Sequence, residues 1–229
     1  FRRVLFRSQI GLADVSAGDV IEDSGATGTD VVEITEGGTI DLTAMSLSGI
    51  EKLAFSGEGN EVNLHSRMAD FSAIQIVGSE LSDTLEVTLG HDDAVTLNVT
   101  DVERLRLQTD GANTVDLTDV AAVAGGGLEV STGAAEDQLE LTGAALSVNA
   151  SAYLGELSVK GKDGASFDVV TGSNSTSIAS NAGAVTVNAQ KLADEAALNL
   201  VGSSSYTVTG LVGDLDASEA SGAVSIETG

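Results

Sequence analysis

A six-residue pattern recurs three times along the chain: DVVEIT at 30–35, DTLEVT at 83–88 and DQLELT at 137–142. Each copy alternates apolar and polar residues, and this period of two is typical of a β-strand with one buried face. Valine, isoleucine, leucine and threonine dominate the pattern, and these side chains suit a pleated sheet. The copies begin 53 and 54 residues apart, which indicates an internal repeat rather than chance similarity.

Other positions in each copy keep the same spacing. A second pattern places Leu53, Leu105 and Leu157 at intervals of 52 residues, within stretches that also alternate. Glycine, asparagine, aspartate and serine clusters lie between the expected strands, and these residues favour turns. Helix signals are confined to 66–74 and 189–198, and one turn of helix at most is expected in each. The repeat divides the chain into copies over about 30–82, 83–136, 137–193 and 194–229.

Strands of this length cannot bury an apolar face alone, so the copies must stack on one another. Rungs of roughly 21 to 31 residues, each with two or three strands, fit the repeat and stack at intervals of about 4.8 Å. We therefore predict an all-β fold, a parallel β-solenoid over residues 9–229 built from repeats of about 53 residues. Leu53, Leu105 and Leu157 are expected to lie in file inside one core. The alternative is a pair of immunoglobulin-like β-sandwiches, but the chain has no tryptophan for their cores and they predict no 53-residue period.

The chain has 229 residues, with 35 acidic and 10 basic side chains and a formal net charge of −25. This charge repels phosphate, which excludes nucleic-acid binding, and it excludes anionic membranes for the same reason. No apolar run is long enough to span a bilayer, so no membrane insertion is expected. The absence of cysteine excludes disulfides and thiolate metal sites.

The first eight residues, FRRVLFRS, are basic and do not match the rest of the sequence. We interpret 1–8 as a non-native or artefactual segment, and the chain as an internal fragment of a longer protein.

Three stretches resemble the β-strand repeats of large bacterial proteins secreted by the type I route: LSGIEKLAF at 47–55, GSELSDTLEVT at 78–88 and YTVTGLVGDLDAS at 206–218. Repeats-in-toxin (RTX) proteins and RTX-like surface-layer proteins belong to this group. The resemblance implies an extracellular or cell-surface location and a role as an adhesin or coat. It also implies contacts with neighbouring repeats of the same parent chain, with cell-surface glycans or with other coat subunits. The RTX nonapeptide GGxGxDxUx is missing, so the resemblance does not extend to a regular calcium ladder.

Aspartates occupy one position of the repeat, just before a strand, as Asp30, Asp83, Asp137 and Asp194. Calcium prefers six to eight oxygen ligands, and turns rich in aspartate and backbone carbonyls can provide them. The alternative is an Asx-turn, in which the carboxylate caps its own backbone. Denser clusters of acids near glycines are further candidates for calcium. The predicted calcium ligands are Asp83, Asp92, Asp93, Asp110, Asp137, Asp163, Asp214 and Asp216.

Catalysis has little support in the sequence. His65 and His91 are the only histidines, and neither has an equivalent in the other copies. We therefore predict no catalytic residues, no cofactor other than calcium, and no enzymatic activity. The expected function is a structural or adhesive extracellular repeat module that calcium stabilises. The alternatives are a calcium-dependent module that binds carbohydrate or a partner, with an irregular loop at 172–183, and a polysaccharide-acting β-helix enzyme.

Overall fold

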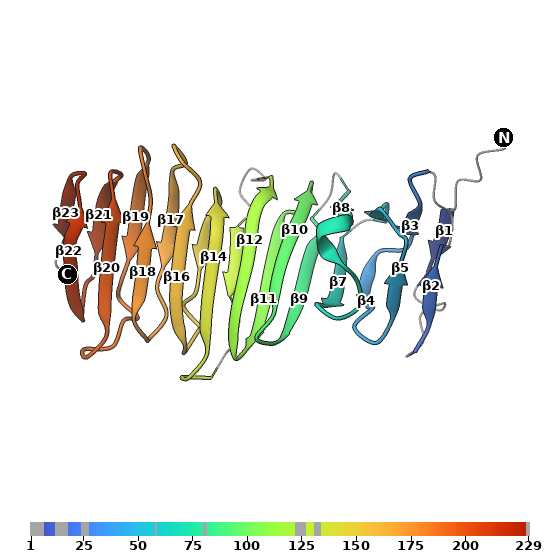
Figure 1. The fold of residues 1–229 in the computed structure, drawn as a ribbon, viewed down its shortest axis with the longest axis horizontal. Coiled ribbons are helices and arrows are strands. Elements are labelled where there is room, and N and C mark those ends of the chain that lie inside the picture. Colours follow the sequence, from blue (N-terminus) through green and yellow to red (C-terminus); the bar gives the residue numbers. More distant parts are fainter. Residues whose placement is uncertain are drawn as a thin grey trace.

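The computed structural model describes residues 7–11, 18–23, 28–57, 59–79, 82–121, 127–130 and 134–227. These residues form a rod of stacked strands, with the N-terminus at one end and the C-terminus at the other (Figure 1). The rod is a parallel β-solenoid, which confirms the predicted fold class. Within the described ranges the one helical element is a short 3-10 turn, η2 (Phe71–Ala73). No helix in them is long and apolar enough to cross a membrane.

Two long sheets form opposite sides of the rod. Sheet 1 has eleven strands in the following order: β1 (Arg7–Ile10), β3 (Val31–Ile34), β6 (Lys52–Phe55), β8 (Gln75–Val77), β10 (Ala94–Thr100), β12 (Ala112–Val120), β14 (Gln138–Ala144), β16 (Glu156–Gly161), β18 (Thr176–Ala179), β20 (Ala197–Gly202) and β22 (Asp214–Ala220). Sheet 2 has ten strands: β4 (Gly38–Asp41), β7 (Asn60–His65), β9 (Thr84–His91), β11 (Arg104–Asp110), β13 (Gly127–Val130), β15 (Ser147–Asn149), β17 (Phe167–Val170), β19 (Ala184–Asn188), β21 (Ser205–Thr209) and β23 (Val224–Glu227). A small third sheet pairs β2 (Val20–Glu22) with β5 (Ser46–Ser48).

Each coil, meaning one circuit of the chain around the rod axis, contributes one strand to sheet 1 and the next to sheet 2. The coil length is about 21 residues. Leu53, for example, pairs with Val32 of the coil before it and with Ile76 of the coil after it. Alternate residues point inward, so these three side chains are buried in one continuous apolar core. The period-two pattern of the sequence therefore builds a column of stacked apolar side chains between the two sheets.

The 53-residue repeat spans about two and a half coils, not a whole number of them. Leu53 lies in β6 of sheet 1, Leu105 in β11 of sheet 2, and Leu157 in β16 of sheet 1. All three side chains are buried in the same core, as predicted. The expectation that they lie in file is wrong for Leu105, which faces the other two from the opposite sheet. An extra half coil carries each successive repeat to the other side of the rod.

Two local expectations change in the structure. The stretch 172–183 is not an irregular loop, because β18 runs through it and pairs with β16 and β20. Arg7 and Ser8, which we had assigned to the N-terminal segment, belong to β1 and pair with Val31 and Val32. The two weak helix signals behave as expected: η2 falls within 66–74, and 189–198 contains turns followed by the first residues of β20.

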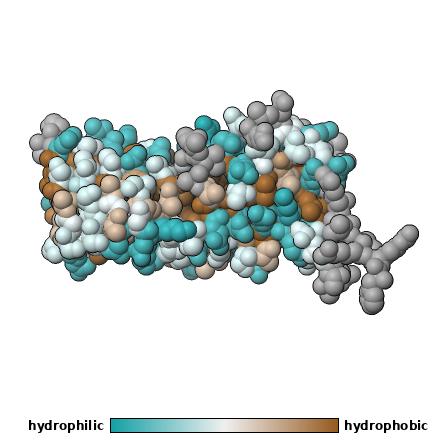
Figure 2. Space-filling model, turned by 90° about the horizontal axis from the view of Figure 1, so that it is seen from above, coloured by the Kyte–Doolittle hydropathy of each residue, from teal (hydrophilic) through white to brown (hydrophobic). Residues whose placement is uncertain are grey.

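The coil formed by β22 and β23 lies at the C-terminal end of the described chain and differs from the coils inside the rod. Its inward positions are less covered, since Leu215 and Val224 are only partly buried. Ile226 is 46% exposed. Figure 2 shows apolar atoms at this end of the rod, whereas hydrophilic atoms cover much of the visible side. Burial in the inner coils therefore comes from neighbouring coils above and below, not from the two sheets alone.

Candidate functional site

Buried aspartates hold the corners where the chain enters several strands. The Asp83 side chain is 1% exposed, directly before β9. Its Oδ1 accepts hydrogen bonds from the backbone N and Nδ2 of Asn60, both at 3.0 Å. Its Oδ2 accepts from the backbone N of Ser79 at 2.5 Å and from the Ser79 hydroxyl at 2.8 Å. The carboxylate thus joins its own turn to the preceding coil of the rod.

The same corner recurs on the opposite side of the rod. Asp137 precedes β14 and is 4% exposed. Its Oδ1 accepts from the backbone N of Gly111 at 3.0 Å, and its Oδ2 accepts from the backbone N of Ala134 at 2.7 Å. Asp83 and Asp137 therefore both reach back to the preceding coil, one beside sheet 2 and the other beside sheet 1. The repeat encodes one corner that alternates between the two edges of the rod.

Glutamates of the following coil complete two of these corners. The backbone N of Asp30 donates to Glu51 at 2.8 Å, and that of Asp83 donates to Glu103 at 2.7 Å. This role of the glutamates is not among the sequence predictions, although their 52-residue spacing is the signal that could have revealed it. Asp194 does not share the arrangement, because it is exposed in the turn before β20.

Two predicted calcium ligands, Asp92 and Asp110, flank His91 at one corner of the rod. Asp92 Oδ2 lies 3.4 Å from His91 Nε2, and Asp110 Oδ1 lies 3.8 Å from His91 Nδ1. Asp93 is adjacent, but its Oδ2 accepts from the backbone N of Gly90 at 2.6 Å and from the Ser66 hydroxyl. Asp92 has a positive φ of 59°, and its Oδ1 accepts from the backbone N of Ala112 at 3.0 Å. Backbone N–H groups thus hold the two central carboxylates.

The other predicted ligands are dispersed. Asp163 is exposed and its Oδ1 lies 3.4 Å from Asn181 Nδ2, while Asp214 is exposed at the start of β22. Asp216 accepts from the backbone N of Ser218 at 2.9 Å, and hydrogen bonds from the Ser218 hydroxyl and backbone lower the pKa of its carboxyl. The same Asx-turn, in which the residue two positions later lowers the carboxyl pKa, occurs at Asp41 and Asp116.

Across the described residues, no group of three or more histidine, aspartate and glutamate side chains is arranged to hold a metal ion. The eight predicted ligands instead lie at several separate corners, and hydrogen bonds within the protein engage several of their carboxylates. Calcium binding therefore stays a prediction.

The two histidines lie at the ends of strands β7 and β9. The Nδ1 of His65 accepts from the backbone N of Arg67 at 3.1 Å and lies 3.2 Å from the Ser66 hydroxyl. That hydroxyl donates its hydrogen bond to Asp93. A serine nucleophile is activated when it donates to a histidine that an aspartate orients, and Ser66, His65 and Asp93 do not have this arrangement. The side chain of His91 is 66% exposed, beside two exposed aspartates. The contacts at both histidines are those of turn and surface residues.

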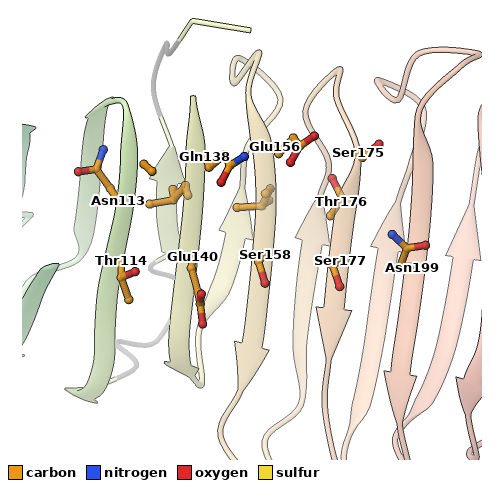
Figure 3. A pocket seen from close by; sticks show the side chains of 13 residues that line it. Asn113, Thr114, Gln138, Glu140, Glu156, Ser158, Ser175, Thr176, Ser177 and Asn199 are labelled. Carbon is orange, nitrogen blue, oxygen red and sulfur yellow. The ribbon is translucent and has the colours of Figure 1, made fainter. Parts of the chain in front are cut away.

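A shallow groove lies on the outer face of sheet 1, across β12 to β20, with a volume of about 410 Å³ (Figure 3). Thr114, Glu140, Ser158, Ser177 and Asn199 occupy one row in register along the rod, and their outward positions line the groove. Lys160 forms an ion pair with Glu140. The groove thus offers hydroxyls, amides and carboxylates in sequence along the axis.

A second groove, of about 690 Å³, lies on the outer face of sheet 2 over β9 to β17. Its residues include Arg104, Gly127 and Ser147, which also stand in one row along the rod. Neither groove has an aromatic side chain among its lining residues. Neither groove is visible in the sequence, because each depends on strand register between coils. Comparison of the chain with protein-family models, with curated protein sequences and with solved structures found no match.

Proposed function

We propose that the chain is a non-catalytic structural module, a rigid rod within a large secreted or cell-surface bacterial protein. The observation that carries this proposal is the unbroken ladder: both long sheets run in parallel register through the described coils around one apolar core. Every internal strand is hydrogen-bonded to the coil before and the coil after it, so bending the rod strains two sheets at once. Stiffness along the axis is the property that a stalk or coat module needs.

The charge distribution supports a solvated, repetitive module. The formal net charge is −25, and acids alternate outward along several strands. Such a surface keeps a protein with long sheets soluble and opposes edge-to-edge association. The buried aspartates serve the corners instead of a reaction, since hydrogen bonds within the chain engage Asp83 and Asp137. The proposed extracellular location rests on the resemblance to secreted repeat proteins.

A polysaccharide-acting enzyme has less support. Glycosidases need two carboxylates at a defined separation, with one held protonated, and commonly an aromatic platform for the sugar. Glu140 and Glu156 share the groove of sheet 1, but Glu140 is paired with Lys160 and no aromatic side chain lines the groove. The grooves therefore suit contact with a ligand better than turnover of one.

Small-angle scattering combined with an activity screen tests the proposal. We expect an elongated monomer about 48 Å long, since eleven strands stack at about 4.8 Å, and no release of reducing ends or unsaturated sugars from a polysaccharide panel. A compact spherical particle or sustained release of products would contradict the structural role.

Calcium stabilisation is a second candidate property, since the carboxylates of two predicted ligands, Asp92 and Asp110, lie 3.4 Å and 3.8 Å from the ring nitrogens of His91. Calorimetry of the chain in millimolar calcium and in chelator tests it. A higher melting temperature with calcium supports a bound ion, and an unchanged melting temperature removes the proposal.

A further inference from the structure

A row of five outward positions crosses the groove of sheet 2 along the rod axis. Strand register aligns Thr84 with Arg104, Arg104 with Gly127, and Gly127 with Ser147. The next residue in the row is Asp168, since its neighbour Val169 pairs with Val148. Gly127 has no side chain and Ser147 has a small one, so the middle of the row lies below the longer side chains of Arg104 and Asp168 at its ends. We call this part of the groove the trough.

The two arginines of β11 differ in their partners. Arg106 pairs with Glu61 at 3.3 Å and with Glu129 at 3.2 Å. Arg104, two residues earlier on the same face, is exposed and makes no ion pair with any described residue. The adjacent Glu103 carboxylate accepts from the backbone N of Asp83 instead. In a chain with 35 acids, an arginine at the edge of a groove that forms no ion pair with any described residue offers its N–H donors to a ligand.

The other end of the trough carries an acceptor. Asp168 is exposed, and its backbone N lies 3.4 Å from the Ser147 hydroxyl. Its carboxylate has no hydrogen-bond or ion-pair partner among the described residues. The trough thus has a guanidinium with five N–H donors at one end and a carboxylate at the other, above a floor of glycine and serine. Arg104 and Asp168 stand three strands apart, which corresponds to about 14 Å.

This combination fits a sugar chain. Sugar hydroxyls accept hydrogen bonds from a guanidinium and donate them to a carboxylate, and hydroxyls on different rings of one sugar chain can reach both ends of a trough about 14 Å long. Glu103, Glu129 and Asp168 surround the trough, and together with the net charge of −25 they repel an anionic chain. We propose that the trough binds a neutral glycan through Arg104 and Asp168. The structural role proposed above stands even if the trough binds nothing.

Titration of the chain with neutral hexasaccharides tests the proposal. The probes are cellohexaose, laminarihexaose, maltohexaose, mannohexaose and chitohexaose, followed by amide chemical shifts in NMR. We expect at least one probe to shift amides of β11, β13 and β15. Arg104→Ala should weaken its affinity at least tenfold, because the donor is lost, and Gly127→Thr should do the same, because a side chain fills the low floor. Ser225→Ala, at an exposed position of β23 on the same sheet and three strands beyond Asp168, is the matched control and should leave affinity unchanged.

Three results would overturn the proposal. One is the absence of any amide shift with all five probes at about 10 mM, because a specific site would bind its ligand measurably at that concentration. Another is binding that neither Arg104→Ala nor Gly127→Thr weakens while both variants keep the wild-type melting temperature. The third is binding of oligogalacturonate in preference to every neutral probe, since the trough would then be a site for anions.

Discussion

Two regions of the rod build the same corners from different chemistry. Between residues 30 and 137 the buried polar groups at the corners are mostly carboxylates, with Asp83 as the best-connected example. Beyond residue 163 they are neutral. Ser204, for example, is fully buried; its hydroxyl donates to the Ser180 hydroxyl at 2.9 Å and accepts from the backbone N of Gly183 at 3.0 Å.

The difference shows that the same fold forms whether the buried polar groups at its corners are charged or neutral. A carboxylate offers only acceptors, so one aspartate can serve up to four donors through charge-assisted bonds, at the cost of burying a charge. A serine hydroxyl donates and accepts at once, and it buries no charge. The parallel solenoid accepts either solution. The N-terminal corners should therefore respond to loss of an acceptor much more strongly than the C-terminal corners.

Asp83→Ala is expected to have the largest effect. It leaves the donors of Ser79 and Asn60 buried without an acceptor, and we expect a loss of about 4 kcal/mol in the free energy of unfolding. Urea unfolding followed by circular dichroism measures this loss. Asp83→Asn is the comparison: it keeps one acceptor oxygen but sets an NH2 group against the donors that the other oxygen served, so it should lose less than Asp83→Ala. An equal loss for both variants would mean that one acceptor oxygen does not preserve the corner.

Tyr153 and Tyr206 allow a second comparison, at high pH. Both rings are buried, but the Tyr206 hydroxyl donates to the carbonyl of Val201 at 2.5 Å, whereas that of Tyr153 has no hydrogen-bond partner among the described residues. Burial raises the pKa of Tyr153 to about 12; the nearby Thr109 hydroxyl opposes this shift, and the carboxylates of Asp137 and Glu156 add to it.

The folded state therefore keeps the Tyr153 proton more tightly than the unfolded chain, whose tyrosines titrate near pH 10. The stability linked to this group is fully present below pH 10 and declines as the pH rises to about 12, by about 2 to 3 kcal/mol. Chemical unfolding between pH 9 and pH 12 measures the decline. Tyr153→Phe should show a shallower decline than the wild type, and an identical slope in both proteins would contradict the assignment.

Ser204→Ala should have the smallest effect, about 1 kcal/mol, because it removes a neutral hydroxyl from a corner that has other backbone bonds. The loss should be the same at pH 4 and pH 7, since no charge is involved. Thermal unfolding at the two pH values checks this. A loss as large as that of Asp83→Ala would erase the proposed difference between the two regions.

The fold could be predicted from the sequence because period-two alternation and a repeat register are local signals. The assignment of strands to sheets could not, because Leu53 and Leu105 occupy equivalent repeat positions but lie in opposite sheets. The strand at β18 was missed because Thr176, a polar residue, takes an inward position that usually carries an apolar side chain. Local pattern thus predicts strands more reliably than it predicts which side of the rod they join.

The site residues were harder to predict, for a related reason. Asp83 is predicted as a calcium ligand, but its donors on Asn60 lie 23 residues away, so the sequence could not show that its carboxylate caps a corner of the rod. The trough depends on Gly127 standing next to Arg104, and these residues are neighbours only through register between coils. A site formed by residues of neighbouring coils can be predicted only when the number of residues per coil is known.

The half coil in each repeat sets a rule for how such rods can change length. Inserting or deleting one 53-residue unit would rotate everything beyond it by half a turn, so a surface that faced one way would then face the opposite way. Two units together amount to five full circuits and restore the original orientation. Gene rearrangements that lengthen or shorten the rod should therefore preserve a functional face only when they add or remove units in pairs.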